Sequence, residues 1–182
     1  IADGAHQSDI HALHGYVPRS EIARLSVLLE TIHGIGQFDG LGVWEALKLI
    51  SVYRLKDAPA VLYEFLKERS EEPDTNISHR AMSTYRHHVA FVRRRPYRAW
   101  YLVKVGDDFV GAIYLSKTDE VGVFIRRAWR GGGLGPKAIA ALMERHPRPR
   151  YLANINPKNE RSIALFKQLG FGLLQHTYEL RK

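Results

Sequence analysis

The sequence contains no cysteine, which excludes a disulfide, a thiolate metal site and a cysteine nucleophile. It also lacks an apolar run of the roughly 18 residues that a membrane-spanning helix needs. The sequence also shows no charged segment followed by an apolar one, the pattern that would indicate a signal peptide. With 45% apolar and 25% charged residues, the chain has the composition of an ordinary globular protein, and we expect a cytoplasmic location without membrane association.

Acidic residues are outnumbered, since 19 Asp and Glu face 27 Lys and Arg, which gives a formal net charge of +8. Such an excess suits nucleic acid, an anionic membrane or a small polyanionic ligand. The basic residues cluster at Arg93–Arg95 and at Arg126, Arg127 and Arg130, next to a glycine-rich stretch. This clustering favours a small polyanion as the partner and makes nucleic acid a weaker alternative.

The chain divides into two parts at about residue 50. Residues 1–50 are interpreted as a helical extension that ends in an apolar helix from Val43 to about Ile50. His11 and His14 have helical spacing, but no third ligand accompanies them, so no metal site is predicted. The role of the extension is open.

Residues 51–182 alternate between strand-like and helix-like patterns. The order of strand, two helices, three strands, helix, strand, helix and strand indicates an α/β fold in which helices flank a mixed sheet. Strands are predicted at Val52–Leu55, Trp100–Val105, Val110–Ser116, Val121–Ile125, Tyr151–Ile155 and Leu173–Leu180. Helices are predicted after a cap at Asp57, after a cap at Ser83 over Thr84 to about Arg94, and at Pro136–Arg145 and Glu160–Leu169.

The stretch Arg130-Gly131-Gly132-Gly133-Leu134-Gly135 lies between a predicted strand and a predicted helix. Glycine tolerates positive φ, so backbone amides can point outward together, and the helix adds unpaired N–H groups and its dipole. This arrangement binds phosphate. A P-loop would need Gly-Lys-Ser/Thr, and a dinucleotide fingerprint would lie early in the chain, so neither explains this loop.

Two motifs in residues 51–182 resemble those of the GCN5-related N-acetyltransferase (GNAT) superfamily. The glycine loop fits the pyrophosphate-binding pattern Arg/Gln-x-x-Gly-x-Gly/Ala. The second motif, an Asn-led helix that ends in Gly-Phe, is Asn159-Glu160-Arg161-Ser162-Ile163-Ala164-Leu165-Phe166-Lys167-Gln168-Leu169-Gly170-Phe171. The resemblance implies the GNAT fold, acetyl-CoA as co-substrate and acyl transfer.

The resemblance also implies a cofactor site on the strand before the loop, on the loop and on the Asn-led helix. The strand amides would hold the pantetheine and the thioester carbonyl. Pro136 removes one N–H donor after the loop, so fewer amide contacts are expected. The implied cofactor-binding residues are Val123, Phe124, Ile125, Arg130, Gly131, Gly132, Gly133, Leu134, Gly135, Lys137, Asn154, Asn159, Ser162 and Phe166.

Transfer of an acetyl group to an amine requires proton removal from the amine and, usually, a proton for the leaving thiolate. Glu120, at the start of the same strand, is the candidate general base, directly or through water. The family often has tyrosine where this chain has Phe166, which cannot donate a proton. Tyr178 is the candidate acid, with His176 and Tyr151 as alternatives.

The acceptor is predicted to be the primary amine of a small molecule, with a nucleotide-linked amino sugar as one class. Four residues are the candidates for contacting it: His79, Arg80, Tyr85 and His176. A protein or peptide acceptor, a CoA sensor without activity and a basic nucleic-acid-binding module are the alternatives. Either a monomer or a homodimer is compatible with the sequence.

Overall fold

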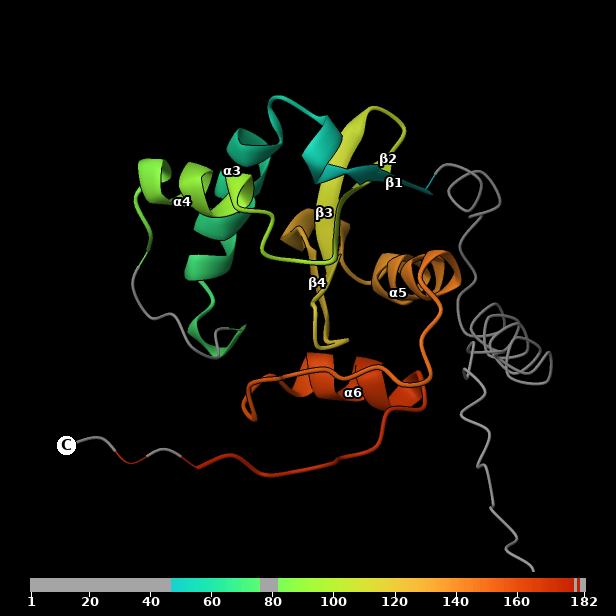
Figure 1. Cartoon of the computed structure of the whole chain (residues 1–182). Coiled ribbons are helices and arrows are strands. Elements are labelled where there is room, and N and C mark those ends of the chain that lie inside the picture. The colour runs from blue at the N-terminus through green and yellow to red at the C-terminus, as the bar shows by residue number, and fades with distance from the viewer. Residues whose placement is uncertain (1–46, 76–81, 179, 181–182) are drawn as a thin grey trace, which may run out of the picture.

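Four antiparallel strands in the order β1-β2-β3-β4 form the centre of the structure, a computed structural model that describes residues 47–75, 82–178 and 180 (Figure 1). The strands are β1 (Leu47–Ser51), β2 (Ala99–Val105), β3 (Asp108–Leu115) and β4 (Val121–Ile125). Gly106 takes a φ of 57° in the turn between β2 and β3, as glycine allows. The three strands predicted between residues 100 and 125 are therefore confirmed.

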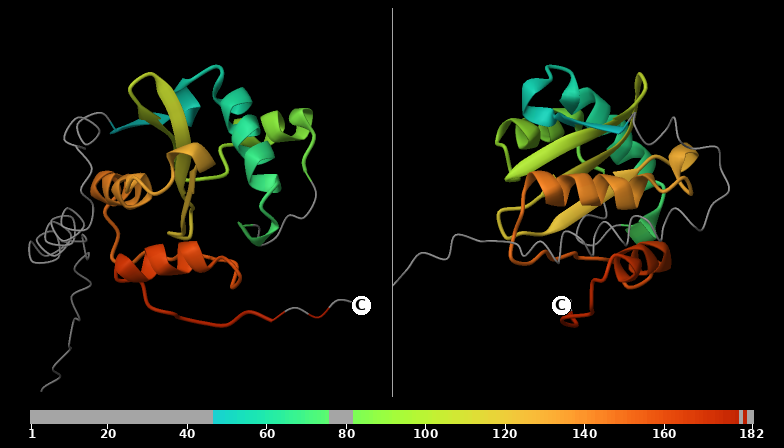
Figure 2. Two further views of the ribbon diagram at one scale, coloured as in Figure 1. Left: turned by 180° about the vertical axis from the view of Figure 1, so that it is seen from behind. Right: turned by 90° about the vertical axis from the view of Figure 1, so that its right-hand side faces the viewer.

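Helices cover both faces of this sheet. Helices α3 (Ala58–Ser70) and α4 (Tyr85–Arg93) lie on one face, α5 (Leu134–Arg145) lies on the other, and α6 (Glu160–Gln168) lies near the end of β4 (Figures 1 and 2). Short 3-10 turns occur at Val52–Arg54, Pro73–Thr75 and Arg127–Trp129. Among the described helices, none combines the length and apolar composition needed to cross a bilayer.

Alternation along β3 divides the core into two clusters. Ile113 and Leu115 pack with Ile139 of α5 on one face. Ala112 and Tyr114 pack on the other face, against the cluster that includes Phe65 of α3. Each fully buried aliphatic side chain contributes about 1.5–3 kcal/mol, so both layers hold the sheet in place. In β4, Phe124 shares the α3 face, and by the same alternation so do Gly122 and Glu120, the residue just before the strand.

The N-terminal element of the fold corrects two predictions. Residues 47–50 belong to strand β1, where a helix was predicted, and Val52–Arg54 is a 3-10 turn, where a strand was predicted. Leu49 is buried against α5 and pairs with Val103 of β2, and this tertiary pairing overrides the helical propensity of the segment. β1 therefore begins before the predicted boundary at residue 50.

The C-terminal strands also differ from prediction. Of Tyr151–Ile155, Leu152 alone pairs, through an isolated parallel bridge to Glu120, so the mixed direction of the sheet rests on that bridge. Residues 173–178 and 180 form no strand and are exposed. A strand forms only when its backbone pairs with a neighbouring strand, and within the described chain Leu152 is the single residue of segment 151–155 that pairs in this way.

Two helix starts are also corrected. Thr84, and not Ser83, caps α4, and its side chain accepts a hydrogen bond from the His87 N–H at 3.4 Å. Helix α5 begins at Leu134, so Pro136 is its third residue and not its first. Proline at this position still removes a donor from the open end of the helix.

Candidate active site

The outer edge of β4 opens immediately after its bridge to Leu152. The Val121 N–H donates to the Leu152 carbonyl at 2.8 Å, and no further ladder joins β4 to residues 153–155 in the described chain. Glu120 and Arg126 flank β4; the Glu120 carbonyl accepts from the Ser116 N–H, and the Arg126 N–H donates to the Val110 carbonyl of β3. Every second residue from 120 to 126 therefore bonds toward the β3 side. The N–H groups of Val123 and Ile125 consequently point toward the open edge.

Glu120 stands at the beginning of this open edge. Its Oε1 accepts a hydrogen bond from Asn154 Nδ2 at 2.8 Å, which joins the two segments where they diverge. The side chain is partly exposed, so it can exchange protons with solvent or a ligand. Asn154 is one of the predicted cofactor-binding residues, and in the structure its amide contacts the candidate base.

The glycine loop leads directly into the N-terminus of α5. Gly131 and Gly133 have φ values of 87° and 72°, which a residue with a side chain rarely adopts. A side chain at Gly131 or Gly132 would meet no other atom within 4 Å, so the loop is open to a ligand. The N–H groups of Leu134 and Gly135 have no intrahelical acceptor, and the helix dipole is positive at this end. These features fit a phosphate group.

Lys137 lies beside the same loop. Its Cε is 3.9 Å from the position that a Cβ on Gly133 would take. Burial lowers the pKa of Lys137 to about 8, so its charge can change near physiological pH. A bound phosphate would favour the charged ammonium and raise this pKa again.

Arg130, predicted to meet phosphate, is held by the protein itself. Its Nε donates to the Ile125 carbonyl at 2.8 Å and its Nη1 donates to both carboxylate oxygens of Glu72, at 2.7 and 3.0 Å. These bonds tie the end of β4 to the residues that follow α3. Arg130 therefore positions the β4 edge and the loop in this structure.

The neighbouring arginines also pair with α3. Arg126 Nε and the Arg127 N–H both donate to Glu68, at 3.0 and 2.5 Å. Burial raises the pKa of Glu68, but the donors from Arg127 and Arg126 outweigh it and hold that pKa below its usual 4.5. The basic cluster seen in the sequence is thus largely neutralised by glutamates from a distant segment.

Helix α6 combines a capped end with a buried face. Asn159 Oδ1 accepts a hydrogen bond from the Ser162 N–H at 3.1 Å, so Asn159 caps the helix. Phe166 is 5% exposed and packs edge-to-face on Phe171, with ring centroids 5.0 Å apart. Phe166 belongs to the core, and the cofactor roles predicted for these residues remain predictions.

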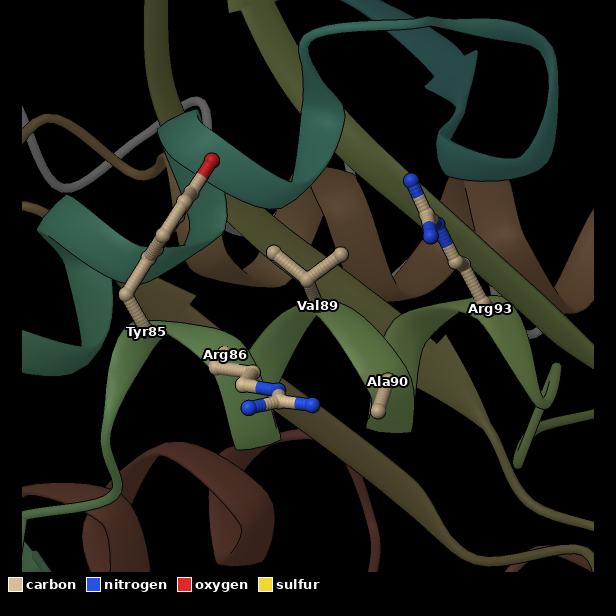
Figure 3. A pocket seen from close by; sticks show the side chains of 5 residues that line it. All are labelled: Tyr85, Arg86, Val89, Ala90 and Arg93. Atoms are coloured by element: carbon tan, nitrogen blue, oxygen red, sulfur yellow. The ribbon is translucent and has the colours of Figure 1, made fainter.

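Two of the four predicted acceptor residues, Tyr85 and His176, lie within the described chain, and their role remains a prediction. Tyr85 packs on Tyr63 of α3, at 5.1 Å between ring centroids, and lines a surface hollow along α4 with Arg86, Val89, Ala90 and Arg93 (Figure 3). Tyr178 is 90% exposed, and its ring lies 6.4 Å from that of His176 on the C-terminal segment. His79 and Arg80, like residues 1–46, lie outside the described residues.

Two tyrosines near Glu120 were not predicted from the sequence to belong to the site. Tyr97 and Tyr114 stack with ring centroids 4.0 Å apart and an interplanar angle of 12°. A Cβ on Gly122 would lie 2.2 Å from Tyr114 Cζ, so the phenol lies across β4 next to Glu120. The glycine at position 122 was the available signal, because a glycine inside a strand often marks a close approach.

An α/β sheet with an open strand edge, a glycine loop at a helix N-terminus and an adjacent carboxylate fits a transferase that uses a phosphate-bearing cofactor. The sequence model of the Acetyltransferase (GNAT) family matches residues 60–171, and the chain belongs to that family. It is accordingly an acetyl-CoA-dependent acyltransferase. No curated protein matches the chain.

Solved structures share this fold. A domain from Methanocaldococcus jannaschii DSM 2661 has a TM-score of 0.63 at 16% identity and covers 73% of this chain and 92% of its own. RimL, a ribosomal L7/L12 alpha-N-protein acetyltransferase in complex with coenzyme A, has a TM-score of 0.56 at 14% identity and covers 69% of this chain and 80% of its own. The protein yncA from Salmonella typhimurium, with its cofactor acetyl-CoA, has a TM-score of 0.55 at 19% identity and covers 69% of this chain and 78% of its own. At these identities the likeness shows the fold alone.

Proposed function

We propose that this protein transfers the acetyl group of acetyl-CoA to the primary amine of a small molecule, by direct attack in a ternary complex. One observation carries the proposal: the carboxylate of Glu120 lies where β4 leaves its neighbour and its amides become available. A base and an oxyanion-stabilising edge are two of the elements that amine acylation requires.

Acetyl-CoA supplies an activated acyl carbon when bound. The amides of the loop and of α5, with Lys137, would hold its phosphates, and the pantetheine would follow the open edge of β4. Val123 and Ile125 N–H groups would donate to the carbonyl oxygen as negative charge develops on it. Because backbone donors are fixed by the sheet, they need no rearrangement during the reaction.

Glu120 would take a proton from the incoming amine, directly or through one water. Asn154 donates to Oε1, which leaves Oε2 to face the amine and fixes the orientation of the carboxylate. Phe166 is in the core and has no proton to give, so we assign protonation of the leaving thiolate to solvent or to Tyr178.

Calorimetry with acetyl-CoA and a thiol-release assay with a panel of amines test the proposal together. Replacing Glu120 with glutamine should lower turnover on the order of 10²-fold and remove its pH dependence, with CoA affinity nearly unchanged. Glu64→Gln, on an exposed glutamate of α3 that pairs with Lys67, is the matched control. An unchanged rate in Glu120→Gln would remove Glu120 as the base, and failure to bind CoA at micromolar concentration would remove the cofactor role.

A second candidate is N-acetylation of a protein or peptide. RimL acts on the alpha-amino group of a ribosomal protein, and its fold is similar. Exposed Arg86 and Arg93, beside the α4 hollow, would suit an acidic peptide (Figure 3). Turnover on peptides and not on small amines would favour this candidate, whereas CoA binding without any turnover would favour a sensor.

A further inference from the structure

Arg69 lies on the face of α3 that covers the catalytic side of β4. Phe65, one helical turn earlier, packs on Phe124 with ring centroids 5.6 Å apart. Residues four apart share a helix face, so Arg69 continues that row toward the C-terminal end of α3. Its side chain is partly buried, and its Nη2 donates to the Thr75 carbonyl at 3.1 Å, which fixes the guanidinium in place.

Arg69 differs from the other arginines around the site because no carboxylate pairs with it. Glu68 on α3 pairs with Arg126, and Glu72, just after the helix, pairs with Arg127, Arg130 and Arg161. Across the described part of the chain, Arg69 makes no ion pair. A partly buried guanidinium is costly to leave without an anion, so the site favours an anionic ligand.

The charge of Arg69 acts on the same two phenols as the charge of Glu120. Burial raises the pKa of both Tyr97 and Tyr114; Arg69 lowers those values and Glu120 raises them further. Although Arg69 and Glu120 share these neighbours, no ion pair joins them. A ligand with an amine for Glu120 and an anion for Arg69 would complement both charges.

We propose that the acetyl acceptor is an amine that carries a carboxylate or phosphate group, and that Arg69 anchors this anion beside the stacked Tyr97–Tyr114 pair while Glu120 receives the amine. The inference rests on the proposed function and adds the substrate class to it. The transfer itself forms the amide bond and breaks the thioester C–S bond; one amine proton goes to Glu120 and the thiolate leaves. The acceptor's anion stays unchanged throughout.

Matched pairs of acceptors test this inference. Each pair has the same amine with and without the anion: glycine and glycinamide, β-alanine and β-alaninamide, and O-phosphoethanolamine and ethanolamine. Thiol release from acetyl-CoA should be faster with the anionic member of at least one pair, on the order of tenfold or more in kcat/KM. The first two pairs vary the distance from amine to carboxylate, and the third tests phosphate.

Arg69→Gln should reduce this preference on the order of tenfold to a hundredfold, mainly through KM, and Arg69→Lys should restore part of it. Arg54→Gln, on an exposed arginine, should keep the preference. Calorimetry with CoA shows whether each variant is folded. The inference is overturned if the wild-type protein binds CoA but favours the neutral members, acetylates none of the anionic ones, or keeps its preference in Arg69→Gln. Loss of CoA binding in the wild-type protein would instead refute the proposed function.

Discussion

Replacing Glu72 with glutamine is expected to lower the free energy of unfolding by about 1–2 kcal/mol at pH 7. Glu72 receives Arg130 Nη1 on both oxygens, and its side chain is 21% exposed against 16% for Arg130. A hydrogen bond to a charged group contributes about 1.5–3 kcal/mol when it is made. Glutamine keeps one oxygen acceptor but leaves the guanidinium charge uncompensated, so part of that stabilisation is lost. Arg127 and Arg161 are more exposed, and their pairs with Glu72 add little.

The pH dependence of this effect has a definite sign. Burial raises the pKa of Glu72, but bonds and charge from Arg130, Arg127 and Arg161 outweigh it and hold the folded-state pKa below 4.5. A depressed carboxylate pKa stabilises the folded state above the unfolded pKa, and this stabilisation is lost as pH falls through the folded pKa. The difference between wild type and Glu72→Gln should therefore be constant from neutral pH down to about 5 and shrink below about 4.5.

Urea denaturation followed by circular dichroism measures both quantities. Glu71→Gln is the matched control, because Glu71 is adjacent, 66% exposed and, within the described chain, bonded to the exposed Arg127 alone. Its denaturation midpoint should equal that of the wild type. Equal stabilities of Glu72→Gln and Glu71→Gln would refute the reasoning, as would a difference that persists unchanged at pH 3.

Three further predictions concern the site. Gly133→Glu should abolish CoA binding in calorimetry because it places a carboxylate at the phosphate loop. Gly133→Ala imposes the same unfavourable φ of 72° on a residue with a side chain but adds no charge, so it should retain most of the binding. Equal losses in the two variants would refute the charge argument. Gly122→Ala should destabilise the fold by about 1–3 kcal/mol in urea denaturation, since its Cβ meets the Tyr114 ring. In a Tyr114→Ala background, which lacks that ring, the same change should have a much smaller effect. CoA affinity should fall as pH rises through about 8, where Lys137 loses its charge, and Lys137→Met should remove this dependence.

The features that were predicted correctly from the sequence are those defined by short local motifs. The glycine loop and the Asn159 helix are each defined by a few consecutive residues, and the structure retains both as an open helix start and a capped helix. Leu134 begins its helix within the loop itself because Gly133, with φ of 72°, ends the preceding extended backbone. Interactions of this kind are contained in a short window of sequence.

Long-range pairing explains what was not predicted. Leu47–Ser51 has good helix formers, and its strand state depends on β2, some fifty residues later. Arg130 and Glu72 are 58 residues apart, and no local sequence pattern predicts their contact. The stacking of Tyr97 on Tyr114 similarly requires knowing that a loop and a strand meet.

The arginines show why net charge alone cannot locate a binding site. Glutamates on α3 and just after it pair with Arg126, Arg127 and Arg130, the residues whose clustering in the sequence indicated a polyanion site. We therefore propose that anions bind at two other places. The backbone amides of the glycine loop, with Lys137, would bind the cofactor's phosphates, and Arg69 would bind the acceptor's anion. Because these two groups come from α5 and α3, on opposite faces of the sheet, the cofactor's phosphates and the acceptor's anion would bind without competing for the same cation (Figure 2).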